Sequence, residues 1–207
     1  MNLLESIVAD RDPLLIGLGV AGIIVLVAAA GIIWRWHRHR RALRRLEQSL
    51  SDISFEYRRN VAISDGADTL LHIDYLLLTP RGVVLVDLRD VRGNIFGGDQ
   101  MTQWTVMHPR SRSTFENPQG ALLDRIAAVK RVAADLSVEG RIVFGDGARF
   151  PKGVPSNTLL LGGLTADLPV VDRQALRGIH EAFAPAWQNL LEALQPSPLR
   201  KPRAVVS

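Results

Sequence analysis

The stretch HIDYLLLTPRGVVLVDLR, residues 72–89, decides the fold. Two apolar segments flank Pro80-Arg81-Gly82. A proline and a glycine this close together are typical of a tight turn between antiparallel strands. With an even loop centred between Pro80 and Arg81, Asp74 faces Asp87 near the open end of the hairpin. A three-residue loop would instead shift the register and separate the two aspartates onto opposite faces of the sheet.

Two facing carboxylates would repel each other, because cross-strand side chains lie only about 5 Å apart. Two explanations remain open at this point. A divalent cation such as Mg²⁺, held by Asp74 and Asp87, would offset the repulsion. A salt bridge would do so as well, since Arg89 can reach Asp74 diagonally or Asp87 along its own strand. His72 lies beside the pair, and an exposed or hydrogen-bonded histidine is favoured there over a metal ligand.

The remaining soluble sequence predicts an α/β domain with a mixed sheet flanked by helices, over residues 51–194. Asn117-Pro118 opens an amphipathic helix, since asparagine caps helices and proline suits the first turn. Short apolar strands and a helix over residues 172–194 follow. Residues 195–207 contain three prolines and are expected to be a disordered tail.

The N-terminal part predicts one transmembrane helix over residues 14–34, because Leu14–Ile33 is a continuous apolar run without charge. Residues 1–13 would form a short extracytoplasmic N-terminus. Residues 35–50 would form a basic juxtamembrane helix, since this segment is rich in arginine. Positive charge behind the apolar run places the N-terminus outside and the domain in the cytoplasm. We therefore expect a single-pass protein of the inner (cytoplasmic) membrane, in contact with the lipid bilayer.

A cleaved signal peptide is the alternative for this segment, with Ala28-Ala29-Ala30 as the cleavage region. The length of the apolar run, its acidic N-terminal flank and the arginines behind it favour the uncleaved anchor. The chain of 207 residues has no cysteine, which excludes disulfides and thiolate metal sites, and carries a net charge of +4. A basic balance favours anionic partners, either nucleic acid or acidic lipid.

The hairpin, then Gly93-Asn94-Ile95, Trp104 and Glu116-Asn117-Pro118 together resemble the nuclease-related domain (NERD) family. The resemblance covers about residues 43–161 and implies a relative of the restriction-endonuclease-like fold, whose core signature is Asp followed by Asp/Glu-x-Lys. It further implies that Asp74 and Asp87 bind Mg²⁺, and that Arg89 stands at the lysine position. In that case the metal would polarise the scissile phosphate of DNA or RNA.

Several positions depart from the family pattern. Asp87-Leu88-Arg89 replaces the usual Glu-x-Lys, and arginine keeps its charge, so it can clamp a phosphate but cannot act as a general base. Tyr75 replaces a histidine, and Ala121 stands where a glutamine is usual after Asn-Pro. We therefore predict an altered site, with Asp74, Asp87 and Arg89 as its residues, for either Mg-dependent phosphodiester hydrolysis or nucleic-acid binding with weakened or lost catalysis. The alternative is a non-catalytic, membrane-tethered interaction module that retains the fold.

Overall fold

The structure, a computed structural model, describes residues 13–67 and 69–198. The chain divides into two compact units, Met1–Glu47 and Gln48–Ser207. Helix α2, Pro13–Asp52, contains the first unit's described residues and continues into the second unit. The expected transmembrane and juxtamembrane segments thus belong to one uninterrupted helix. Most of the expected extracytoplasmic segment lies outside the described residues.

Among the side chains of the first unit that the structure describes, the exposed large apolar ones lie on α2, and they are Ile23, Val25, Leu26, Val27, Ile32, Ile33 and Trp34. Among the helices of the described residues, none is long and apolar enough to cross a membrane.

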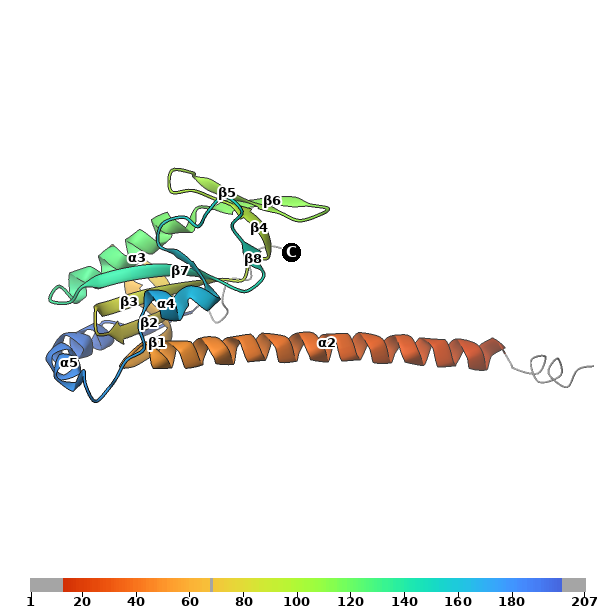
Figure 1. Cartoon of the computed structure of the whole chain (residues 1–207), viewed down its shortest axis with the longest axis horizontal. Coiled ribbons are helices and arrows are strands. Elements are labelled where there is room, and N and C mark those ends of the chain that lie inside the picture. Colours follow the sequence, from red (N-terminus) through yellow and green to blue (C-terminus); the bar gives the residue numbers. More distant parts are fainter. Residues whose placement is uncertain (1–12, 68, 199–207) are drawn as a thin grey trace, which may run out of the picture. The chain divides into compact units, whose positions relative to one another are not determined.

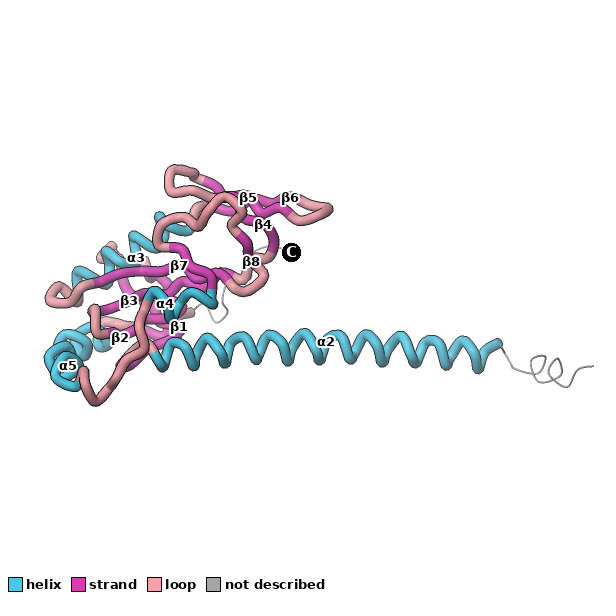
Figure 2. The backbone as a smooth tube through the Cα atoms, in the orientation of Figure 1, coloured by secondary structure: helices cyan, strands magenta, loops and turns pink. Residues whose placement is uncertain are grey.

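The second unit is an α/β domain with two sheets (Figures 1 and 2). The larger sheet has the strand order β10-β1-β2-β3-β7-β9, and the smaller has the order β6-β5-β4-β8. The strands of the larger sheet are β1 (Glu56–Ser64), β2 (Leu70–Thr79), β3 (Gly82–Arg89), β7 (Val138–Phe144), β9 (Thr158–Leu160) and β10 (Gln195–Pro196). Those of the smaller sheet are β4 (Gly93–Phe96), β5 (Gln103–Met107), β6 (Arg112–Glu116) and β8 (Ala148–Arg149).

The larger sheet is mixed, as the sequence predicts. Strands β1, β2 and β3 pair antiparallel, whereas β7 pairs parallel with both β3 and β9. The helices of the domain besides the end of α2 are α3 (Pro118–Val132), α4 (Leu164–Asp167) and α5 (Arg177–Glu192), with a 3-10 turn η1 at Leu161–Gly163. Mixed sheets flanked by helices are consistent with a nuclease-like α/β fold.

The β2–β3 hairpin has the predicted register. Thr79 pairs with Gly82 around the two-residue loop, and Leu76 pairs with Leu85. Gly82 adopts a φ of 113°, a conformation that side-chain-bearing residues rarely reach. The Thr79 hydroxyl closes the turn by donating to the Gly82 carbonyl at 2.9 Å.

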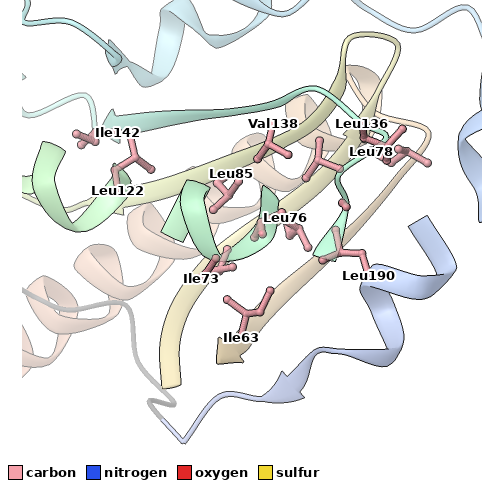
Figure 3. Close-up of a cluster of buried hydrophobic side chains, with 14 of the residues drawn as sticks. Ile63, Ile73, Leu76, Leu78, Leu85, Leu122, Leu136, Val138, Ile142 and Leu190 are labelled. Atoms are coloured by element: carbon pink, nitrogen blue, oxygen red, sulfur yellow. The ribbon is translucent and has the colours of Figure 1, made fainter. Parts of the chain in front are cut away.

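Apolar side chains from the strands of the larger sheet and from helices α3 and α5 pack together in the core (Figure 3). Leu76 and Leu85 of the hairpin are at most 1% exposed, and they share this cluster with Leu122 of α3 and Leu190 of α5. Fully burying one such leucine contributes about 1.5–3 kcal/mol, so this cluster fixes α3 against the hairpin. Helix α3 begins as predicted, with the Asn117 side chain accepting from the Gln119 N–H at 2.9 Å.

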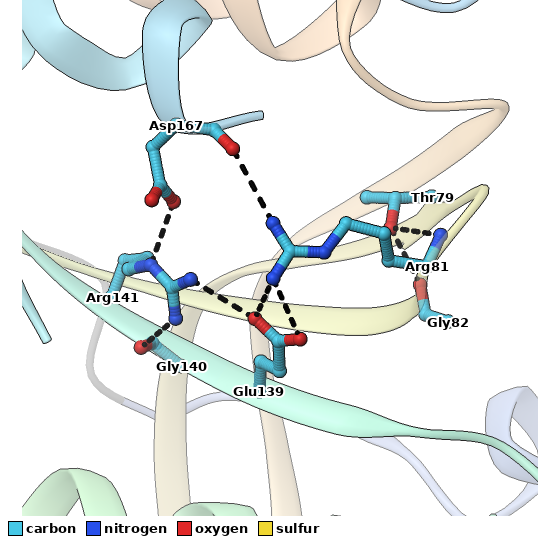
Figure 4. A network of polar contacts seen from close by, with 7 residues as sticks. All are labelled: Thr79, Arg81, Gly82, Glu139, Gly140, Arg141 and Asp167. Atoms are coloured by element: carbon cyan, nitrogen blue, oxygen red, sulfur yellow. Dashed lines mark hydrogen bonds and ion pairs between the residues drawn. The ribbon is translucent and has the colours of Figure 1, made fainter. Parts of the chain in front are cut away.

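A charged network stabilises the turn end of the hairpin (Figure 4). Arg81 donates through Nη2 to both carboxylate oxygens of Glu139 at 2.9 Å, and through Nη1 to the Asp167 carbonyl. Arg141 donates to Glu139 and, through Nε, to the Asp167 carboxylate at 2.7 Å. The network therefore ties the turn and β7 to α4.

The C-terminal segment differs from the expected disordered tail at its start. Gln195 and Pro196 form β10, which pairs antiparallel with Ala62 and Val61 of β1. The free edge of β1 offers unpaired backbone groups, and this short strand satisfies some of them despite its proline, since proline is tolerated in edge strands. Residues 199–207 of the expected tail lie outside the described residues.

Candidate functional site

Asp74 and Asp87 lie on the same side of the sheet, as the hairpin register predicts. Backbone pairing runs from Thr79 and Gly82 to Tyr75 and Val86, and the two aspartates follow next along their strands. Both side chains line one cavity of about 210 Å³. Its walls are formed by Leu70, Leu71, His72, Asp74, Asp87, Leu88, Arg89, Ala121, Asp124 and Arg125.

Two arginines converge on one carboxylate oxygen of Asp87. Arg89 Nη2 lies 2.6 Å from Asp87 Oδ2, along the same strand, and Arg125 Nη1 lies 3.1 Å from the same oxygen. The side chains of Arg89, Arg125 and Asp87 are only 10–12% exposed. The salt bridge between Arg89 and Asp87 is thus one of the two arrangements that the sequence left open.

Asp74 is held by a different set of hydrogen bonds. Its Oδ2 accepts from the Leu88 N–H at 2.8 Å, and its Oδ1 lies 2.8 Å from His72 Nε2. The other ring nitrogen of His72, Nδ1, lies 2.6 Å from the Ser197 hydroxyl. His72 is therefore a hydrogen-bonded histidine, as expected, and connects the C-terminal segment to Asp74.

The two aspartates ionise differently. Burial raises the pKa of Asp87, against the lowering effect of the charges on Arg89 and Arg125. Burial also acts to raise the pKa of Asp74, but hydrogen bonds from His72, the Leu88 N–H and Asp87 outweigh it and leave the pKa lowered. The pKa of Asp87 is therefore shifted in the opposite direction to the pKa of Asp74.

Each guanidinium group uses a single nitrogen on Asp87, although it carries five N–H donors. The Nε of Arg89 is buried and has no hydrogen-bond partner among the described residues. An unsatisfied buried donor is costly unless an acceptor reaches it. The cavity therefore has the donors to bind an anionic group.

Comparison with known proteins identifies the family. The family model of the nuclease-related domain matches residues 34–145, which are more than half of the chain. The chain belongs to the nuclease-related domain family. It is also similar to an uncharacterized protein of Bacillus anthracis, with 25% identity over 85 residues, which are 41% of this chain and 40% of that protein. The chain thus matches less than half the length of this relative. No solved structure matches the chain.

Arg125 is the residue of this nuclease-related domain that sequence reasoning missed. It lies on α3, 38 residues from Asp87, so no local pattern joins the two. The helical spacing nevertheless pointed to Arg125, because Ala121 and Arg125 are four residues apart and share one face of α3. Ala121, which stands at the family's glutamine position, lines the cavity, and the face that follows it carries the second arginine.

The side chains of the cavity do not fit a magnesium ion in this arrangement. Asp87 Oδ2 already accepts from two guanidinium groups, and their positive charges oppose a cation at that oxygen. Within residues 13–67 and 69–198, no three histidine or acidic side chains are grouped so as to hold a metal ion. The Mg²⁺ site on Asp74 and Asp87 stays a prediction from the resemblance.

Proposed function

We propose that this nuclease-related domain, a relative of the restriction-endonuclease-like fold, binds nucleic acid by placing a backbone phosphate in the cavity at the open end of β2 and β3. The observation that carries the proposal is the convergence of Arg89 and Arg125 on Asp87. A phosphate can accept from guanidinium nitrogens that Asp87 leaves unused, because Arg89 and Arg125 both line this cavity.

Hydrolysis is reduced or lost in this proposal. Arg89 retains its charge at any ordinary pH and cannot act as a general base. Both arginines also place positive charge where a catalytic cation would need to approach Asp87. Phosphate binding uses the same charges without a metal ion, so binding is favoured over cleavage.

A wider hollow next to the cavity limits the path of a bound strand. It has a volume of about 870 Å³ and shares Ala121 and Asp124 with the cavity. Its lining includes Asp99, Glu116 and Asp124, and none of the described residues that line it is basic. Because phosphates are repelled by carboxylates, we propose that the strand leaves the cavity away from this hollow.

The test is nucleic-acid binding by the full chain, purified in a mild detergent. Fluorescent single- and double-stranded DNA and RNA are titrated at several salt concentrations, and binding is followed by anisotropy. Arg89→Gln and Arg125→Gln are each expected to weaken binding roughly tenfold and to reduce the salt slope by about 1, as for one lost phosphate contact. Arg177→Gln is the control, because Arg177 lies on α5 with its side chain 79% exposed.

The same preparations, incubated with Mg²⁺ or Mn²⁺, measure cleavage. Cutting by the wild type that both Asp74→Ala and Asp87→Ala abolish would replace the binding proposal with an active nuclease. Equal affinity of wild type, Arg89→Gln and Arg125→Gln, or no binding at all, would refute the proposed phosphate contact. The alternative, a non-catalytic interaction module, is then favoured, since Arg89 and Arg125 both pair with Asp87 in the absence of any ligand.

We also propose that the apolar run Leu14–Ile33 anchors the protein in the cytoplasmic membrane, with the domain inside. The support is the uncharged sequence of this run and the arginines that follow it. The chain has no cysteine, so single cysteines report topology directly. A membrane-impermeant maleimide applied to intact cells should label Ser6→Cys but not Ser111→Cys, and labelling of both only after lysis would contradict this orientation.

A further inference from the structure

The C-terminal segment reaches the candidate site from far along the chain. Strand β10 pairs with the edge of β1, and the Ser197 N–H donates to the Asn60 carbonyl at 3.0 Å. This pairing brings the Ser197 hydroxyl to 2.6 Å from His72 Nδ1, although 125 residues separate the two. Ser197 lies outside residues 34–145, which match the nuclease-related domain, whereas His72 lies within them.

The chemistry of the three groups fixes the hydrogen atoms between them. The Asp74 carboxylate can only accept, so the His72 nitrogen that faces it, Nε2, must donate. In the neutral ring Nδ1 is then the acceptor, and the Ser197 hydroxyl donates to it. Each ring nitrogen has one partner, and together the two bonds hold the ring in one orientation.

His72 and Asp74 line the cavity, whereas Ser197 is not among its lining residues. The hydroxyl therefore acts on the ring and not on a ligand. A ring held in this orientation keeps the Asp74 carboxylate directed at Nε2. Without this ring, Asp74 would keep its hydrogen bond from the Leu88 N–H but lose the one from His72, and its charge, which borders the cavity, would repel a phosphate more strongly.

We infer that Ser197 is a positioning residue of the phosphate-binding cavity: its hydroxyl holds the His72 ring in the orientation in which Nε2–H donates to Asp74, and this hydrogen bond reduces the repulsion between Asp74 and a bound anion. This inference rests on the proposed function for its effect on binding. Its structural part, the orientation of the ring, is independent of any ligand.

The first measurement is ¹⁵N and ¹H NMR of the histidine rings in the full chain, with His72→Gln to assign the signals. The wild type is expected to show a protonated Nε2, with its proton protected from exchange with water. In Ser197→Ala this proton should exchange roughly tenfold faster, the factor expected for about one lost hydrogen bond. Ser197→Thr, which keeps the hydroxyl, should restore the protection.

Gln195→Ala is the matched control, because Gln195 pairs through its backbone in β10 and its side chain is exposed. It should leave the His72 signals unchanged. Equal exchange in the wild type and Ser197→Ala, or a wild-type ring protonated at Nδ1 instead, would overturn the inference.

The second measurement is the affinity for the fluorescent oligonucleotides. Ser197→Ala should bind severalfold more weakly than the wild type, and Ser197→Thr should recover the affinity. If the wild type binds the oligonucleotides and Ser197→Ala binds them with equal affinity, the inference is also overturned. If the wild type binds no oligonucleotide, the proposed function fails, while the ring measurement still decides whether Ser197 positions His72.

Discussion

Arg125 Nη1 lies 3.1 Å from Asp87 Oδ2, and this ion pair joins helix α3 to strand β3 at the wall of the cavity. Both side chains are nearly buried, at 12% and 10% exposed. Asp87 also contacts Arg89, so it belongs to a three-residue cluster whose members come from two elements. The cluster makes the stability of the domain depend on groups that also form the candidate site.

We expect Arg125→Ala to lower the free energy of unfolding by about 1–3 kcal/mol, because it leaves a buried carboxylate with one cationic partner in place of two. Urea unfolding of the full chain, followed by circular dichroism, measures the change. Lys130→Ala on the exposed side of α3 is the control and should change stability by less than about 0.5 kcal/mol. Equal effects of the two substitutions would contradict a structural role for the Arg125–Asp87 pair.

The stability that the network in Figure 4 gives to the domain should depend far more on Arg141 than on Arg81. The Arg141 side chain is 12% exposed and pairs with both Glu139 and Asp167, whereas the Arg81 side chain is 44% exposed. Arg141→Ala should destabilise the domain by about 2 kcal/mol, since it leaves two half-buried carboxylates with fewer partners. Arg81→Ala should cost less than about 1 kcal/mol, as for an exposed pair. The reverse order in urea unfolding would show that the turn arginine carries the network.

Gly82→Ala should destabilise the hairpin by about 2–4 kcal/mol. Gly82 has a φ of 113°, and an added Cβ would lie 2.3 Å from the Ser137 carbonyl oxygen. Gly120→Ala is the matched control, because Gly120 lies in α3 and nothing lies within 4 Å of an added Cβ. There alanine should stabilise the helix by about 0.5 kcal/mol. Thermal unfolding of both variants checks the prediction, which a harmless Gly82→Ala would contradict.

The aspartate pair should give two opposite dependences of stability on pH. The lowered pKa of Asp74 stabilises the fold above its ordinary value of about 3.9, and this contribution is lost as pH falls through the folded-state pKa. The raised pKa of Asp87 has the opposite sign. Its contribution is present below about 3.9 and is lost as pH rises through the folded-state pKa.

Asp87→Asn should therefore gain stability relative to the wild type as pH rises above about 3.9, whereas Asp74→Asn should lose stability relative to the wild type as pH rises toward that value. Urea unfolding at a series of pH values measures both trends, and carboxyl ¹³C shifts assign each pKa. Two aspartates that titrate together at the ordinary value would contradict the split.

The sequence by itself determined the local elements of this protein. The apolar runs on either side of Pro80-Arg81-Gly82 identified the hairpin, and the two-residue loop of the structure has the even register, which the sequence had left open beside a three-residue alternative. The same register placed Asp74 and Asp87 on one side of the sheet. Asn117-Pro118 likewise identified the start of α3, since capping depends on neighbouring residues alone.

Only the tertiary structure decided what surrounds the two aspartates. Arg125 reaches Asp87 because Leu122 and its neighbours pack α3 onto the hairpin, and Ser197 reaches His72 because β10 pairs with the edge of β1. These partners lie 38 and 125 residues away in the chain. Sequence periodicity reports which face of an element is apolar, but not which distant element covers it, so the pairing of Arg125 with Asp87 and of Ser197 with His72 could be found only after the chain was folded.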